Sequence, residues 1–117
     1  MSVQTGKKYS LFIGRYQPFH DGHEALIRSV LKEGKNVCIA LRDTAISEND
    51  PFSIAHRMGM IADRFAAELL DGRVAVRVLP DIEEVCYGRK VGWGIREIRL
   101  AEDIEAISAT AIRNQGE

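Results

Sequence analysis

Short apolar runs alternate with longer amphipathic ones along most of this chain. The apolar runs have the length and composition of buried parallel strands and occupy Lys8–Ile13, Asn36–Leu41 and Arg73–Leu79. Two amphipathic runs, Glu24–Lys32 and Ser53–Leu70, read as helices. The order strand, helix, strand, helix, strand predicts right-handed crossovers and a mainly parallel sheet. We therefore expect an α/β protein with a Rossmann-like, three-layer α/β/α sandwich.

Turn and breaker residues fall between these runs. Gly34 and Asp71-Gly72 follow the two helices, where glycine commonly ends a helix. Asn49-Asp50-Pro51 is a turn and helix-start signal ahead of the second helix. No internal repeat, low-complexity tract or linker appears, so we expect one domain over residues 1–117, with a frayed polar stretch at Met1–Lys7.

The pattern becomes weaker after the third strand. Val85–Tyr87 could form a short fourth strand, and residues 88–94 contain too much glycine for a helix interior. Ile95–Leu100 alternates apolar and charged residues, which fits an edge strand or a short helix equally. A final helix of at most two turns is expected from Ile107. The role of the region from residue 83 to 100 stays open.

Composition narrows the classes of function. The chain has 117 residues and a formal net charge of −1, so no strong field favours nucleic acid or a membrane surface. No apolar run approaches a membrane span, and the first residues lack a signal-peptide core, which predicts a cytoplasmic protein. Cys38 and Cys86 have no neighbours at zinc-ligand spacing, so both are expected to be free thiols, with Cys38 buried in its strand.

The most informative segment lies between the first strand and the first helix. It reads Gly14-Arg15-Tyr16-Gln17-Pro18-Phe19-His20-Asp21-Gly22-His23. Free N–H groups at the start of a helix make such a junction a phosphate site in α/β proteins. His20 and His23 suit phosphate chemistry there, because imidazole N–H groups can donate to phosphate oxygens as charge accumulates, more strongly when protonated. Either histidine alone would more often be a capping or packing residue.

This segment resembles the HxGH motif of the nucleotidylyltransferase superfamily, in the wording G-R-F/Y-Q-P-x-H-x-G-H. That wording is typical of its adenylyltransferase branch, such as the nicotinamide-nucleotide adenylyltransferases. Residues 107–113, Ile-Ser-Ala-Thr-Ala-Ile-Arg, resemble the family's second signature, I-S-x-T-x-I-R. Pro51-Phe52-Ser53 with Arg57-Met58 is a weaker match to archaeal members. Because the two strong motifs lie near opposite ends, the resemblance spans almost the whole chain.

The resemblance implies a nucleotidyl transfer, in which an acceptor phosphate attacks the α-phosphorus of a nucleoside triphosphate and pyrophosphate leaves. By position, His20 would lie near the α- and β-phosphates and His23 near the α-phosphate, which makes both catalytic candidates. Arg15 would bind phosphate in a bidentate fork, although a strand-end arginine can also be an ordinary surface residue. Gly14 and Gly22 complete the first motif, and a side chain at Gly22 would crowd the phosphate.

The second motif would form another phosphate cradle. Ser108 or Thr110 would cap a helix start, leaving hydroxyl and N–H groups for the β- and γ-phosphates. Arg113, one turn further, would neutralise the leaving pyrophosphate and is the third catalytic candidate. Without the upstream motif, a serine and a threonine before a short helix would indicate only a cap.

Candidates for acceptor binding rest on weaker signals, and each has a structural alternative. The set is Arg42, Asp43, Arg57, Tyr87, Arg89 and Trp93. Arg42 and Asp43 end the second strand, where ligands bind in such sheets, but Asp43 could equally be a solvated loop carboxylate or hold magnesium indirectly. Trp93 could stack on an acceptor ring or anchor the core. No protein ligand set for a metal is apparent, so Mg²⁺ is expected to arrive with the nucleotide.

Two departures from the family leave alternatives open. The cytidylyltransferase branch usually shows G-T-F-D and R-T-x-G-I-S-T-T, and neither wording occurs here, which favours ATP over CTP. Nicotinamide-nucleotide adenylyltransferases usually continue into a longer helical segment, whereas this sequence ends shortly after Arg113. The base and acceptor pockets are therefore undefined.

We expect an adenylyltransferase acting on a small phosphorylated acceptor. A cytidylyltransferase for a polyol or sugar phosphate, or a nucleotide-binding module without turnover, are the alternatives. No nucleic-acid or membrane partner is expected. A homo-oligomer is expected, because a short domain with an open sheet edge gains stability when that edge is buried against another copy.

Overall fold

The computed structural model describes residues 6–86, 88, 92 and 94–98. The elements follow in the order β1 (Tyr9–Gly14), α1 (Asp21–Leu31), β2 (Asn36–Asp43), α2 (Ile54–Arg64), α3 (Ala66–Asp71) and β3 (Val74–Pro80). The three strands and the first helix that the sequence predicts are confirmed, with boundaries that differ by a few residues. No helix among these residues is long and apolar enough to cross a membrane.

The strands form one parallel sheet in the order β1-β2-β3. Phe12 of β1 is in register with Ile39 of β2, which is in register with Val76 of β3. The central strand β2 is buried on both faces, and its Val37, Ile39 and Leu41 are fully inaccessible to solvent. Continuous apolar sequence is what such a strand requires, and this explains why β2 could be predicted so readily.

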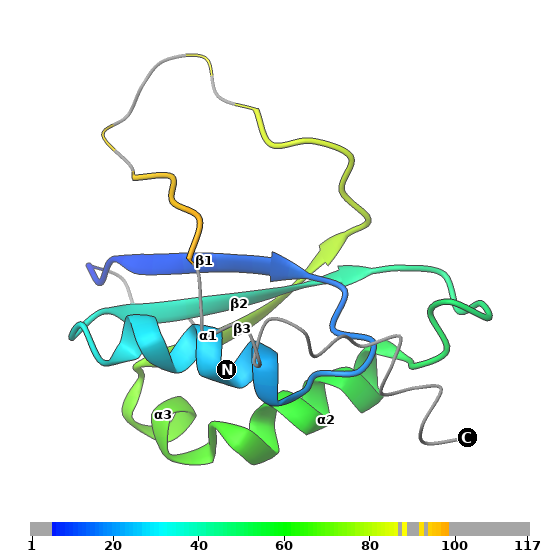
Figure 1. Cartoon of the computed structure of the whole chain (residues 1–117), viewed down its shortest axis with the longest axis horizontal. Helices are drawn as coiled ribbons and strands as arrows, with labels where there is room; N and C mark the ends of the chain where they lie inside the picture. Colours follow the sequence, from blue (N-terminus) through cyan, green and yellow to red (C-terminus); the bar gives the residue numbers. More distant parts are fainter. Residues whose placement is uncertain (1–5, 87, 89–91, 93, 99–117) are drawn as a thin grey trace.

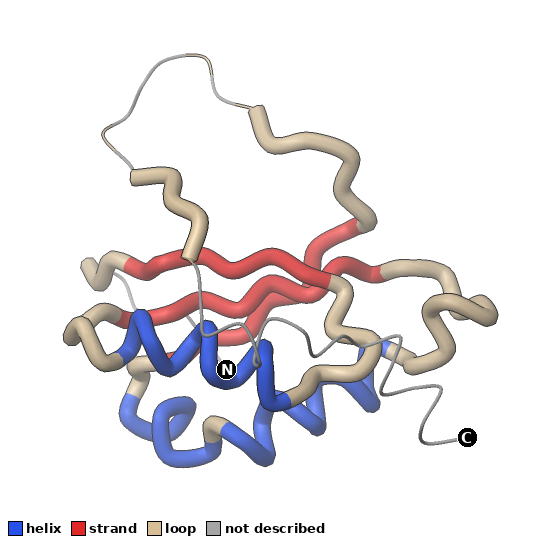
Figure 2. The backbone as a smooth tube through the Cα atoms, viewed as in Figure 1, coloured by secondary structure: helices blue, strands red, loops and turns tan. Residues whose placement is uncertain are grey.

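The helices α1, α2 and α3 lie together on one face of the sheet (Figures 1 and 2). Right-handed crossovers that step in one direction, from β1 to β2 to β3, place their helices on the same face. On β1, Leu11 and Ile13 point to the other face and are 58% and 38% exposed. The expected Rossmann-like α/β architecture with a parallel sheet is confirmed. The described residues form the sheet and a helical layer on one face, and the second helical layer of the predicted three-layer sandwich stays a prediction.

One prediction about the helices is wrong. The continuous helix expected over Ser53–Leu70 is divided at Phe65, where the backbone leaves the helical region with φ −120° and ψ 29°. The Phe65 side chain is fully buried and packs edge-on against Phe19, with ring centroids 6.0 Å apart. On its other side the Arg28 guanidinium lies 4.7 Å from the ring centroid. The break therefore turns a large ring into the core between α1 and α2.

The region after β3 contains no helix or strand among its described residues. Val85 and Cys86 are exposed and are not part of a strand, and residues 95–98 form neither a strand nor a helix. Arg96 nevertheless reaches both carboxylate oxygens of Glu33 after α1, at 3.0 and 3.1 Å, and Ile98 packs against the core. The helix expected from Ile107 lies outside the described residues.

Candidate functional site

The connection between β1 and α1 passes through a tight turn at the carboxyl end of the sheet. Tyr16 has a left-handed backbone, with φ 53°, and its ring folds back over Gly14. A Cβ atom on Gly14 would lie 2.9 Å from the Cε1 and Cζ atoms of Tyr16, closer than carbon atoms tolerate. Tyr16 is buried and also meets the His23 ring edge-on, at 5.0 Å between centroids. Glycine at position 14 thus lets Tyr16 pack against a motif histidine.

His20 and His23 cap the start of α1 through a reciprocal pair of hydrogen bonds. His20 is the N-cap residue, and its Nδ1 accepts from the backbone N–H of Gly22 at 3.0 Å. The Nδ1 of His23 accepts in turn from the backbone N–H of His20 at 3.1 Å. This is the geometry of a capping box, in which two otherwise unpaired helix-start donors are satisfied. Both histidines therefore do cap the helix, but capping uses only the Nδ1 atom of each ring.

These hydrogen bonds determine where each imidazole carries its proton. A Nδ1 that accepts a backbone N–H cannot itself be protonated, so the proton of each neutral ring lies on Nε2. The rings stack, with centroids 3.7 Å apart and planes inclined by 23°. Burial, His20 and Arg64 lower the pKa of His23 to about 3, and burial together with Arg64 lowers the pKa of His20 despite the opposing effect of Asp21. At neutral pH the pair presents two uncharged donors, not the imidazolium considered from the sequence.

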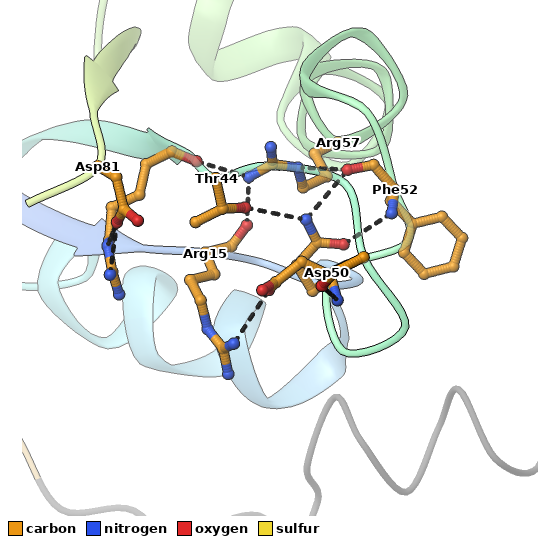
Figure 3. A network of polar contacts seen from close by, with 9 residues as sticks. Arg15, Thr44, Asp50, Phe52, Arg57 and Asp81 are labelled. Atoms are coloured by element: carbon orange, nitrogen blue, oxygen red, sulfur yellow. Dashed lines mark hydrogen bonds and ion pairs between the residues drawn. The ribbon is translucent and has the colours of Figure 1, made fainter.

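Arg15 follows β1 and extends toward the loop before α2. Its Nη1 lies 3.0 Å from Oδ1 of Asp50, and its side chain is 45% exposed. Figure 3 shows this ion pair at the rim of a larger polar network. An exposed ion pair of this kind is worth at most about 1 kcal/mol. An incoming phosphate could therefore replace Asp50 as the partner of Arg15 at small cost.

Two buried polar side chains join the β1–α1 loop to the β2–α2 loop (Figure 3). The Gln17 amide donates to the carbonyl of Phe52 at 3.0 Å, and its oxygen accepts from the N–H of Phe52 at 2.9 Å. The Gln17 amide also lies 3.5 Å from the Thr44 hydroxyl. Gln17 is 1% exposed, so these bonds satisfy a group that would otherwise be costly to bury.

Arg57 is the second of these buried groups. Its Nη1 donates to the carbonyls of Arg15 at 2.7 Å and Arg42 at 2.9 Å, and its Nε lies near the carbonyls of Phe52 and Ser53. The residue is fully inaccessible to solvent. Arg57 therefore connects the ends of β1 and β2 to the start of α2. The acceptor contact considered from the sequence would require this side chain to leave its four carbonyls.

The carboxyl end of β2 brings Arg42 and Asp43 to the same edge of the sheet as the β1–α1 turn. Arg42 is paired with Asp81 after β3, its Nη2 lying 2.6 Å from the carboxylate. Asp43 is exposed. The prediction that both residues occupy the ligand-binding edge is consistent with this placement, and a contact with an acceptor stays a prediction.

Of the remaining predicted site residues, one lies in α1 and the others lie outside the described residues. Gly22 lies in the first turn of α1, between the two histidines. The candidates outside the described residues are Tyr87, Arg89, Trp93, Ser108, Thr110 and Arg113.

His56 is exposed on α2 and stacks on Phe52, with ring centroids 4.9 Å apart. Both cysteines are free and Cys38 is buried, as expected, and Cys86 is exposed. No group of three histidine, cysteine or carboxylate side chains that could hold a metal occurs in the part described.

Sequence reasoning missed the residues that support the motif. Gln17 belongs to the first motif, but the sequence alone assigns it no role, because its burial and its partner Phe52 appear only in the folded chain. Arg64, which binds Asp21 and Glu24 in the first turn of α1, carried no sequence signal, because an arginine near a helix end is common. Only the tertiary structure brings these groups together.

Comparison with known proteins agrees with the motif. The model of the family described as Cytidylyltransferase-like matches residues 11–69, half of the chain. A nicotinamide-nucleotide adenylyltransferase of Caldivirga maquilingensis is 37% identical over 62% of this chain and 43% of its own length. One from Methanospirillum hungatei is 35% identical over 72% of this chain and 45% of its own.

A third relative carries a broader name. The nicotinamide/nicotinic acid mononucleotide adenylyltransferase of Acinetobacter baylyi is 40% identical over 51% of this chain and 33% of its own length. The chain thus spans less than half the length of these curated relatives. The matched family segment contains the whole β1–α1 turn with both motif histidines. This chain belongs to the cytidylyltransferase-like family of nucleotidylyltransferases.

Proposed function

We propose that this protein transfers AMP from MgATP to a small phosphate-bearing acceptor and releases pyrophosphate. An acceptor phosphate oxygen attacks the α-phosphorus. The bond between that phosphorus and the oxygen leading to the β-phosphorus breaks, and the electron pair leaves with pyrophosphate. Negative charge grows on the non-bridging and leaving oxygens, so catalysis requires positioned donors more than covalent help.

The observation that carries this proposal is the pair of imidazoles at the start of α1. Backbone N–H groups occupy Nδ1 of His20 and of His23, so the Nε2–H groups are the ones available to phosphate oxygens. Their orientation is fixed before a nucleotide binds, which spares reorganisation during the reaction. The helix start adds a favourable potential for anions. A structural cap alone would not need two stacked imidazoles.

Arg15 is proposed to bind phosphate after exchanging Asp50 for the nucleotide. Ser108, Thr110 and Arg113 are proposed as the second phosphate cradle on the strength of the I-S-x-T-x-I-R resemblance. Mg²⁺ belongs to the substrate in this scheme, because it keeps several waters and binds phosphate oxygens in preference to a protein cage. In this scheme the described residues of the site contribute hydrogen-bond donors, and no metal ligand is assigned among them.

The relatives' names support ATP as the nucleotide and a mononucleotide as the acceptor. Because this chain spans less than half of their length, we propose both substrates for it on the strength of these names. The test is pyrophosphate release by the full chain with ATP or CTP, Mg²⁺ and a panel of acceptors. The panel holds nicotinamide mononucleotide, phosphopantetheine, and sugar and polyol phosphates.

We expect release with ATP and one acceptor. Release with CTP alone would identify a cytidylyltransferase. Silence with every pair, while ATP still raises the melting temperature, would identify a binding module without turnover.

A further inference from the structure

Arg64, the last residue of α2, reaches across to the first turn of α1. Its Nη1 lies 2.6 Å from Oδ1 of Asp21 and 2.9 Å from Oε1 of Glu24. Asp21 separates the two motif residues His20 and Gly22 in sequence, so this contact is made inside the motif itself. The two carboxylates are three residues apart on one face of the first turn of α1, and the Nη1 of Arg64 pairs with both.

Arg64 is part of a network that connects three helices. Oε2 of Glu24 receives the Nε of Arg28 at 2.7 Å, so each oxygen of Glu24 has its own arginine. Arg28 continues to the carbonyl of Arg64 at 2.8 Å and to Glu68 of α3 at 3.4 Å. Side chains in this network are only 22–36% exposed, apart from Asp21 at 85%. Such a partly buried network fixes geometry better than an isolated surface pair does.

The charge of Arg64 also acts on the histidines. Its guanidinium lies 5.8 Å from the centroid of the Phe19 ring, and Phe19 stacks on His23 at 5.3 Å. The positive charge lowers the pKa of both His20 and His23, in addition to the larger effect of burial. Asp21 opposes it at His20. The uncharged Tyr16 meets His23 from the loop. Arg64 is thus the cation that faces the pair from the neighbouring helix.

We propose that Arg64 is a positioning residue for the histidine pair, holding the first turn of α1 in place through Asp21 and Glu24. Its positive charge also disfavours the charged form of both imidazoles. Its role in turnover rests on the proposed nucleotidyl transfer, whereas its effect on the histidines does not. Arg64 acts through His20 and His23 and makes no contact with substrate in this proposal.

The test compares Arg64→Met, Arg64→Lys and the control Glu68→Gln. Methionine retains an apolar stem beside Phe19 without a charge. Lysine retains the charge and three N–H donors on one nitrogen, so it can still pair with both carboxylates, which Arg64 contacts through Nη1 alone. Glu68→Gln removes a different ion pair of the same network. The first readout is the NMR titration of the three histidines of the chain. His56, at the opposite end of α2, serves as the internal reference.

We expect Arg64→Met to raise the titration midpoints of His20 and His23 and to leave His56 unchanged, with Glu68→Gln like the wild type. Arg64→Lys should keep both midpoints close to wild type. In the pyrophosphate assay, Arg64→Met should lower kcat by about tenfold, the scale of a small misplacement of catalytic groups, with ATP affinity within a few-fold. Arg64→Lys should recover most of that loss.

Unchanged histidine midpoints in Arg64→Met would overturn the electrostatic role, and an unchanged kcat in the same variant would overturn the positioning role. A large loss of ATP affinity in either variant would make Arg64 a binding residue instead. If Arg64→Met does not fold, Glu24→Gln replaces it in the kinetic comparison. Arg64→Lys then replaces it in the titration, and a raised midpoint of His20 or His23 in that variant would overturn the proposal. If the wild type transfers no nucleotidyl group, the proposed function fails, and the titration still decides the effect on the histidines.

Discussion

The Nδ1 of His23 accepts the backbone N–H of His20 at 3.1 Å, and the two rings stack with centroids 3.7 Å apart. The His23 side chain therefore holds the backbone of His20, the N-cap residue of α1. The arrangement couples helix capping to the presentation of two Nε2–H donors. Because capping and phosphate chemistry use different nitrogens, the same two residues can serve both purposes.

Replacing His23 by alanine removes one preorganised donor and one cap. We expect turnover to fall by about a hundredfold or more, the scale for such a donor, while nucleotide affinity stays within a few-fold. Steady-state kinetics and ATP titration measure the two quantities. His56→Ala, on the exposed surface of α2, is the matched control and should retain wild-type turnover. Near-normal turnover of His23→Ala would remove His23 from the chemistry.

Acid should destabilise the fold through the same histidines. Folding lowers the pKa of His20, and that of His23 from 6.5 to about 3, so between those pH values the unfolded chain binds more protons than the folded one. The contribution of His23 is then fully present above about pH 6.5 and is lost as the pH falls toward 3, by up to about 1.4 kcal/mol per pH unit. His20 adds a loss of the same sign. Denaturant unfolding at several pH values measures this slope. His23→Gln should reduce it, and a slope equal to wild type would contradict the assignment.

Gly14→Ala should disturb the turn by displacing Tyr16. The new Cβ would lie 2.9 Å from the tyrosine ring, and overpacking of this kind costs about 1–3 kcal/mol. Gly59→Ala is the control, because a Cβ there meets nothing within 4 Å and alanine favours the helix by up to about 1 kcal/mol. Chemical denaturation of the two variants should show opposite signs. A Gly14→Ala protein as stable as the wild type would mean that Tyr16 does not pack over position 14.

Arg57→Met should cost about 3 kcal/mol or more of stability. The substitution leaves buried carbonyls at the ends of β1 and β2 without their donor, and each unpaired buried group costs about 1–3 kcal/mol. Denaturant midpoints measure the loss, and Arg57→Lys should recover only part of it. A variant with wild-type stability but weaker binding of the acceptor would instead favour the acceptor role expected from the sequence.

The sequence predicts the sheet and the motif well, for physical reasons. A fully buried parallel strand such as β2 has a continuous apolar sequence, and the strand-to-helix junction with its two histidines is a local feature. The break at Phe65 was missed because apolar spacing continues through Ala66–Asp71, and only the core explains why the ring turns inward. Local patterns cannot reveal a turn that tertiary packing imposes.

The supporting polar contacts could not be predicted for a related reason. Gln17 meets Phe52 across 35 residues, and Arg64 meets Asp21 across 43. Neither pair has a local signal, since each depends on how α2 packs beside the β1–α1 turn. The residues of the second motif lie outside the described part of the chain, so their proposed role still rests on the resemblance.

Transfer of label from ATP labelled at the α-phosphorus tests directly whether the histidine pair carries nucleotidyl transfer. The full chain is mixed with labelled ATP, Mg²⁺ and nicotinamide mononucleotide or another acceptor from the panel, and the products are separated. With wild-type protein we expect the label to move to the acceptor. With the His20→Ala/His23→Ala double variant it should stay on ATP, although ATP still binds. Equal transfer by both proteins would contradict the claim that the histidine pair performs the reaction.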